Sequence, residues 1–109
     1  MTKRNLVVVL TTVADGPEAE AMAHTLVEER LAACVNQASV RSTYRWQGRI
    51  ESDDERLLVI KTARDLLPRL EARVAELSSY DVAEFVVLES ATSSASYLAW
   101  VLESCPPVG

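Results

Sequence analysis

The feature that most constrains the fold is a long extended stretch, residues 33–60, interrupted only by the turn pair Gln47 and Gly48. The arm before this turn has about fifteen residues without a strong strand breaker, so a single strand there would reach roughly 50 Å at about 3.3 Å per residue. A compact chain of this length has a radius of gyration of about 13 Å and hence a diameter on the order of 35 Å. The stretch therefore predicts a hairpin that must either bend or extend beyond the domain that carries it.

The first arm of this hairpin alternates in polarity, as a strand with two different faces does. One face carries Val40, Ser42, Tyr44 and Trp46, and the other carries Arg41, Thr43 and Arg45. A two-stranded ribbon without support is only marginally stable in water, and an exposed tip with aromatic rings needs a surface to pack against. We expect Tyr44 and Trp46 to form an interface with other copies of the chain; stacking of both rings on a ligand is the alternative.

The residues before the hairpin predict one strand and one helix. Leu6–Val13 is apolar and β-branched nearly throughout, which is typical of a central strand covered on both faces. Asp15 can cap a following helix, Pro17 fits its first turn, and Glu18 stands at capping-box spacing. The helix is expected to run to about Arg30. Its apolar face consists of Ala19, Met22, Ala23, Leu26, Val27 and Leu31.

After the hairpin, the sequence predicts a second helix that ends near Leu77 and carries Pro68 in its first turn. A short apolar strand, Glu84–Leu88, and a last helix capped by Ser93 or Ser94 follow. The order is β-α-β-β-α-β with an appended C-terminal helix. It predicts an α+β, ferredoxin-like fold with two helices on one face of an antiparallel sheet and a protruding hairpin. We expect one domain over residues 1–109, with loose tails at 1–4 and 104–109.

Composition excludes several function classes. A formal net charge of −5 opposes general binding to nucleic acids or anionic membranes, and no apolar run approaches the roughly 20 residues that cross a bilayer. Cys34 and Cys105 form no CxxC pair. Two free thiols in a reducing cytoplasm are a simpler interpretation than one long-range disulfide. With one histidine and no phosphate loop, HExxH motif or nucleophile elbow, the chain is not expected to be an enzyme.

Two groups of residues could bind a metal ion. His24 stands one helical turn from both Glu20 and Glu28, but a solvated polar stripe is the preferred interpretation of this set. The second group is the acidic run Glu51, Asp53, Asp54 and Glu55. This run lacks the spacing and the central glycine of a calcium loop, so it is interpreted as charge that protects an exposed strand. Cys34 is expected to be a buried, unreactive thiol within a strand.

Several strings match a known family over almost the whole chain. They are VVLTTV (residues 8–13), LVEERLAACVN (26–36), YRWQGRIE (44–51), LVIKT (58–62), SYDVAEF (79–85) and SYLAWV (96–101). Together they resemble the CutA family of divalent-cation tolerance proteins. The resemblance implies a ferredoxin-like protomer related to the PII signalling proteins, and a tight homotrimer whose long hairpins reach across neighbouring subunits. It also implies copper or another divalent ion as a ligand of some members, none of which is an established enzyme.

The sequence departs from the family where copper-binding members have their ligands. The cysteine at the end of the first strand is replaced by Thr11, and the histidine before the Pro-Tyr pair is replaced by Ser78. Hydroxyl groups are poor copper ligands, so weak copper binding is expected and no metal ligand is assigned. The resemblance places four other residues near the subunit clefts. They are Lys61, Tyr80, Asp81 and Glu84, which are expected to bind a ligand or to form interface ion pairs and hydrogen bonds.

Three hypotheses of function follow. The first is a cytoplasmic, CutA-like homotrimer in tolerance to divalent metal ions, with weakened copper binding. The second is a PII-like sensor that binds a small anionic molecule or a partner protein in its intersubunit clefts. The third is a mainly structural trimer.

Overall fold

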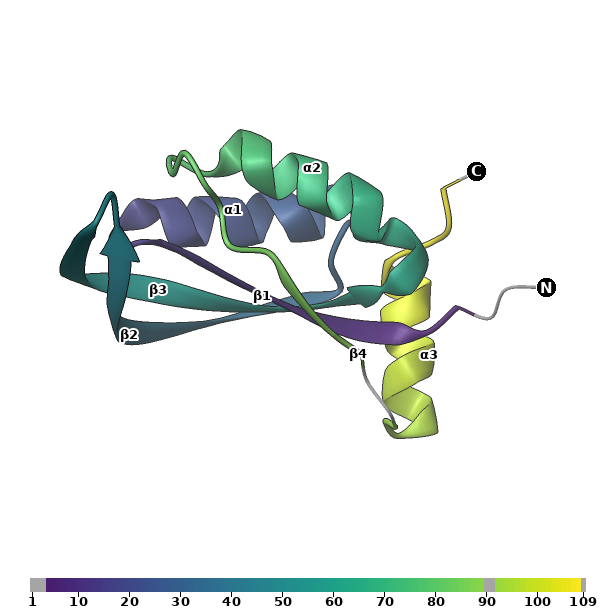
Figure 1. The fold of residues 1–109 in the computed structure, drawn as a ribbon. Coiled ribbons are helices and arrows are strands. Elements are labelled where there is room, and N and C mark those ends of the chain that lie inside the picture. The colour runs from purple at the N-terminus through teal and green to yellow at the C-terminus, as the bar shows by residue number, and fades with distance from the viewer. Residues whose placement is uncertain (1–3, 90–91, 109) are drawn as a thin grey trace.

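The computed structural model describes residues 4–89 and 92–108 and has the predicted α+β order of elements (Figure 1). The elements are β1 (Leu6–Ala14), α1 (Pro17–Glu28), β2 (Cys34–Trp46), β3 (Arg49–Ala63), a 3-10 turn (Arg64–Leu66), α2 (Leu67–Leu77), β4 (Val86–Glu89) and α3 (Ala95–Ser104). The strands form one antiparallel sheet in the order β2-β3-β1-β4. This arrangement is ferredoxin-like and confirms the predicted fold class.

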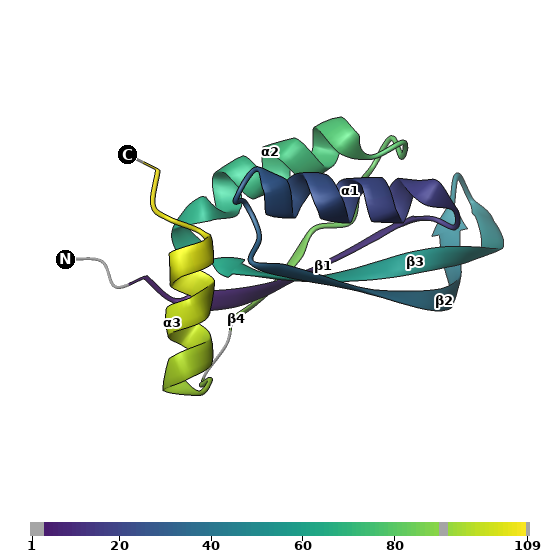
Figure 2. The ribbon, with the colours of Figure 1, turned by 180° about the vertical axis from the view of Figure 1, so that it is seen from behind.

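The helices leave one face of the sheet uncovered. Figures 1 and 2 show α1 and α2 on the same face, while α3 stands across the end of the sheet where β1 begins and β3 ends. The main core lies under α1 and α2, and it takes Val9 and Val13 from β1 and Leu58 and Ile60 from β3. A second buried cluster at the α3 end includes Val101. Alternate residues of β1, β3 and β4 therefore face away from both helices.

The hairpin both bends and lengthens the molecule. Trp46 pairs with Arg49 across the predicted two-residue turn, and Gln47 and Gly48 have positive φ angles of 50° and 80°, as a type I′ turn requires. Pairing of β1 with β3 stops at Ala14, beyond which the hairpin is a ribbon free to twist more strongly. Its outer end turns toward the side of the sheet that carries the helices (Figures 1 and 2). The molecule is 47 Å long, with a radius of gyration of 14.6 Å.

The start of α1 differs from the predicted capping box. The cap residue is Gly16, at a φ of 135°, and no side chain bonds to the helix start there. Asp15 instead accepts a hydrogen bond from Arg56 Nε at 2.8 Å. Glu18 is also engaged elsewhere, because it accepts from Ser79. The last helix, by contrast, begins as predicted. Ser94, one of the two predicted caps, accepts a hydrogen bond from the Tyr97 amide at 3.3 Å.

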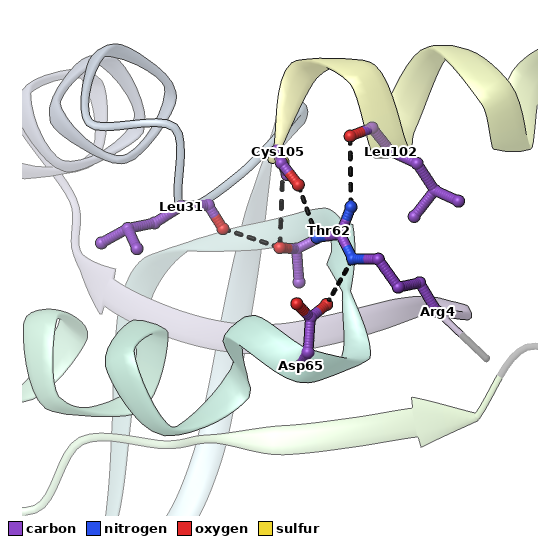
Figure 3. A network of polar contacts seen from close by, with 6 residues as sticks. All are labelled: Arg4, Leu31, Thr62, Asp65, Leu102 and Cys105. Carbon is purple, nitrogen blue, oxygen red and sulfur yellow. Dashed lines mark hydrogen bonds and ion pairs between the residues drawn. The ribbon is translucent and has the colours of Figure 1, made fainter. Parts of the chain in front are cut away.

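The α3 end of the molecule is tied together by polar contacts (Figure 3). Arg4 donates to Asp65 at 3.0 Å and to the carbonyl oxygens of Leu102 and Cys105 at 3.3 and 2.6 Å. A cation suits these carbonyls because they lie at the negative end of the helix dipole. The expectation of loose tails therefore does not hold for Arg4 or for Cys105, whose side chain is fully buried. Residues 1–3 and 109 of those tails lie outside the described residues.

No helix in the described part of the chain has both the length and the apolar character needed to cross a membrane.

Candidate functional site

A cavity of about 780 Å³ lies between the bent hairpin and the segment that joins α2 to β4. It is lined by Thr12 at the end of β1, by residues 42–44 and 46 of β2, by Glu55 of β3, and by residues 79–82 and 84 of the joining segment. This volume is typical of a small-molecule site. Tyr80, Asp81 and Glu84, three of the four residues predicted near a cleft, meet here.

Glu55 lies at the inner wall of this cavity. Only 7% of this residue is exposed, so its interpretation as charge that protects an exposed strand was wrong. Glu55 is the first residue of β3 that pairs with β1, opposite Ala14, and it also pairs with Val40 of β2. The Tyr80 hydroxyl donates to Glu55 Oε2 at 2.5 Å. Burial, followed by this hydrogen bond and the charge of Glu55, raises the pKa of Tyr80 well above its ordinary value.

The aromatic residues of the hairpin tip form another wall. Tyr44 and Trp46 are 40% and 39% exposed, and both line the cavity. The Tyr44 hydroxyl donates to Asp53. This hydrogen bond, with smaller effects of desolvation and of the charges of Asp53, Glu55 and Glu51, raises the pKa of Tyr44 to about 12. The tip therefore presents ring surface to the cavity in an environment of negative charge.

The joining segment is held by the first turn of α1. Glu18 accepts two hydrogen bonds from Ser79, at 3.0 Å from its backbone nitrogen and at 2.6 Å from its hydroxyl. The hydroxyl of Ser78 accepts from the Tyr80 amide at 3.1 Å, which closes a local turn. These contacts fix the backbone that carries Tyr80 into the cavity.

Glu84 and Asp81 are the two carboxylates of this cavity that no other group holds among the described residues. Glu84 has no hydrogen-bond or ion-pair partner among residues 4–89 and 92–108, and its side chain is exposed at the rim. Partial desolvation, and then the charge of Glu55, raise the pKa of Glu84 above its ordinary value. Two carboxylates of the same cavity thus repel each other.

Lys61 does not join the other predicted cleft residues. It lies nearer the other end of β3, opposite Val8 of β1 and Cys34 of β2, and its Nζ is 3.9 Å from Cys34 Sγ. Cys34 is only partly buried, contrary to its predicted burial, because β2 is an edge strand and residue 34 is its first residue. A role of Lys61 in a cleft stays a prediction.

The residues considered as metal ligands in the sequence do not come together in the described structure. The side chain of Thr11 is fully buried, and its hydroxyl has no partner in the described part of the chain. Ser78 is engaged by Tyr80. His24 and Glu28 form an exposed pair at 3.2 Å, whereas Glu20 accepts from Gln37 at 2.9 Å. Within residues 4–89 and 92–108, no three His, Cys, Asp or Glu side chains are grouped to hold a metal ion.

Sequence reasoning missed several lining residues of the cavity, namely Thr12, Ser42, Thr43, Ser79 and Val82. They carry no local signal, since hydroxyl and small apolar side chains occur in any strand or loop. The alternation in β2 did place Ser42 on the face of Tyr44 and Trp46, and that was the one available signal.

Comparison with known proteins finds one protein family that matches nearly the whole chain. Residues 7–104 match the family model of the CutA1 divalent ion tolerance protein. The divalent-cation tolerance protein CutA of Thermus thermophilus is 46% identical over 98 residues, which cover 89% of this chain and 95% of that protein.

Two crystal structures extend the comparison to the fold. The structure of CutA from Xylella fastidiosa superposes with a TM-score of 0.91 at 35% identity, and covers 94% of this chain and 99% of its own. The structure of the periplasmic divalent cation tolerance protein CutA from Archaeoglobus fulgidus gives 0.90 at 27% identity, with 93% and 99% covered.

Proposed function

The chain belongs to the CutA1 divalent ion tolerance family, and we propose that it acts in tolerance to divalent cations as a homotrimeric binding protein rather than as an enzyme. The match over residues 7–104 carries this proposal. A binding role also fits the site, because the one histidine of the sequence is exposed on α1 and is not among the residues that line the cavity. A cytoplasmic location belongs to the same proposal, supported by two free cysteines.

Copper binding is proposed to be weak in this protein. Thr11 and Ser78 offer only hydroxyl groups, which bind copper less well than thiolate or imidazole. The experiment is a calorimetric titration of the metal-free protein with copper. We expect no site tighter than about 1 µM. A tighter site would contradict the proposal, and repeating the titration with His24→Ala and Cys34→Ser would then show which side chain supplies the ligand.

The homotrimer is supported by the uncovered face of the sheet. Leu10 of β1 pairs with Val59 of β3 and Val86 of β4, and cross-strand partners point to the same face. Leu88, opposite Val8, extends this apolar surface and is 47% exposed. An apolar face that no helix covers is unfavourable in a monomer. Neighbouring copies that cover it, with Tyr44 and Trp46 at the hairpin tip, would remove this cost.

Light scattering and sedimentation test the trimer. A monomeric protein at micromolar concentration would exclude it. If the hairpin tip is an assembly element, Trp46→Ala should shift the equilibrium toward monomers at nanomolar concentration, because a buried tryptophan contributes several kcal/mol. Trp100→Ala removes the same side chain from α3, where it is 44% exposed, and should leave the trimer intact.

Ligand sensing is the second candidate function, and the cavity of about 780 Å³ favours it. If the cavity takes a small molecule, that molecule should raise the melting temperature, because ligand binding stabilises the native state. A thermal-shift screen of metabolites with the metal-free protein would separate this function from metal tolerance.

A further inference from the structure

Asp15 is the one aspartate of the sequence that is followed by glycine. The carboxyl group of an aspartate can react with the backbone nitrogen of the next residue, and a glycine there has no side chain to hinder the approach. The pair lies between β1 and α1, and the Gly16 nitrogen donates no hydrogen bond among residues 4–89 and 92–108. No atom beyond the neighbouring residues lies within 4 Å of the position that a Cβ of Gly16 would take. The reacting nitrogen is therefore unhindered.

The carboxyl group of Asp15 lacks the restraints that are usual in a turn. An aspartate often accepts from the amide two residues further along, but that residue is Pro17, which has no N–H group. Asp15 does not cap α1 either, because Gly16 is the cap residue and no side chain bonds to the helix start. Its partner in the described chain is Arg56, whose Nε donates to Asp15 Oδ1 at 2.8 Å. A single contact thus holds this carboxyl group.

This ion pair lies on the helix side of the sheet, not on the uncovered face that the proposed trimer covers. Arg56 stands opposite Val13 of β1, and the Val13 side chain belongs to the core under α1 and α2. Cross-strand partners share a face of the sheet. The Asp15 side chain is 51% exposed and lines a hollow of about 290 Å³. Water therefore reaches the carboxyl group.

We propose that the Asp15–Gly16 bond is a site of spontaneous isomerisation to isoaspartate, and that Arg56 restrains this reaction. The Gly16 nitrogen attacks Asp15 Cγ, its proton passes to solvent, and the hydroxyl of the protonated carboxyl group leaves as water, which closes a succinimide ring. A water molecule then adds to the backbone carbonyl carbon of Asp15, and the bond from this carbon to the Gly16 nitrogen breaks. The main chain now runs through Cβ and Cγ. The water lost in the first step is regained in the second, so the reaction needs no oxidant or cofactor.

The contact with Arg56 opposes ring closure. Asp15 Cγ must turn to within about 3–3.5 Å of the Gly16 nitrogen, whereas the guanidinium binds the carboxylate in one orientation. Breaking an exposed ion pair of this kind slows a reaction about two- to fivefold. Isoaspartate would lengthen the main chain three residues before Glu18, which holds Ser79 at the cavity. The modification would thus act on a wall of the cavity, and it does not depend on the proposed function.

The experiment incubates the whole protein at neutral pH for several weeks and digests samples with trypsin. Residues 5–30 form a single tryptic peptide whose one aspartate is Asp15, and electron-transfer fragmentation distinguishes isoaspartate from aspartate in it. We expect isoaspartate to accumulate in the wild type, and about two- to fivefold faster in Arg56→Met. Arg41→Met removes the Arg41–Asp54 pair within the hairpin and is the matched control, which should react at the wild-type rate.

Two variants of Asp15 keep the proposal testable if Arg56→Met unfolds. Asp15→Asn keeps an acceptor oxygen for Arg56 and offers a better leaving group, so it should close the same ring faster, lose ammonia and gain mass. Asp15→Glu cannot form the ring and should show no isomerisation. Absence of isoaspartate in the wild type, an Asp15→Asn variant that keeps its amide, or equal rates in folded Arg56→Met and Arg41→Met would overturn the proposal.

Discussion

The two ends of the sheet differ in whether their charged side chains have partners. At the α3 end, the guanidinium of Arg4 pairs with Asp65 and with two backbone carbonyl oxygens (Figure 3). At the hairpin end, Glu55 accepts from the hydroxyl of Tyr80, and Glu84 has no partner among the described residues. The first arrangement is complete and needs nothing more, whereas the second leaves negative charge without a cation. The difference separates contacts that are satisfied within the chain from carboxylates that are not.

Removing Arg4 should have the largest effect on stability. Arg4→Met keeps the apolar stem but removes the donors to Asp65, Leu102 and Cys105, and we expect the free energy of unfolding to fall by about 2–3 kcal/mol. Denaturant unfolding at one fixed protein concentration measures this change. Arg69→Met, an exposed position on α2, is the control and should change stability little. If both variants lost the same free energy of unfolding, the contacts of Arg4 at the α3 end would have no special role in stability.

Two buried threonines offer a matched pair. Thr62 and Thr11 are both fully buried, but Thr62 donates to the Leu31 carbonyl at 2.7 Å, whereas the Thr11 hydroxyl has no partner in the described chain. Thr62→Val should therefore lower the free energy of unfolding by about 1–2 kcal/mol, and Thr11→Val should raise it by about 1 kcal/mol. Urea unfolding curves give both values. A loss of stability in Thr11→Val would mean that its hydroxyl is satisfied.

The hydrogen bond inside the cavity should matter less. Tyr80→Phe leaves Glu55 without its donor, and we expect a loss of about 1 kcal/mol in the free energy of unfolding. Tyr97→Phe is the matched control on α3, because its hydroxyl makes no hydrogen bond within the described residues. Urea unfolding curves measure the free energy of unfolding of both variants. A Tyr80→Phe variant as stable as Tyr97→Phe would indicate that water replaces the tyrosine.

Glu84 should give the smallest effect, and one that depends on pH. Its folded-state pKa is raised, so protonation favours the folded state; this contribution is complete below the unfolded pKa and is lost as pH rises through the folded value. Glu84→Gln should thus melt slightly higher than the wild type at pH 7, with no difference near pH 4. Melting curves across this range measure it. A difference that is constant with pH would have another cause.

Local patterns predicted the elements well, because their signals lie close together in the chain. The Gln47–Gly48 turn and the alternation along β2 follow from neighbouring residues, and both are confirmed. The resemblance to the family placed Tyr80, Asp81 and Glu84 in one group, and all three line the cavity.

The missed contacts join residues far apart in the chain. Glu18 could cap its own helix, yet it holds Ser79, and Glu55 stands in a run of acidic residues that look solvated. Whether Glu55 is buried depends on Tyr80, which arrives from a separate segment after α2. No periodicity within a strand or helix encodes such a meeting. The charge of the cavity was therefore visible only in three dimensions.

The contact of Arg4 with Cys105 also bears on how the chain could be rearranged. Its 2.6 Å hydrogen bond brings the beginning of the first strand and the end of the last helix to one place. Folds whose first and last elements meet tolerate circular permutation. A short linker could join these elements, and new ends could open at the Gln47–Gly48 turn, which would divide the hairpin into two separate arms. Such a permuted chain would keep every strand pairing while removing the covalent connection at the tip.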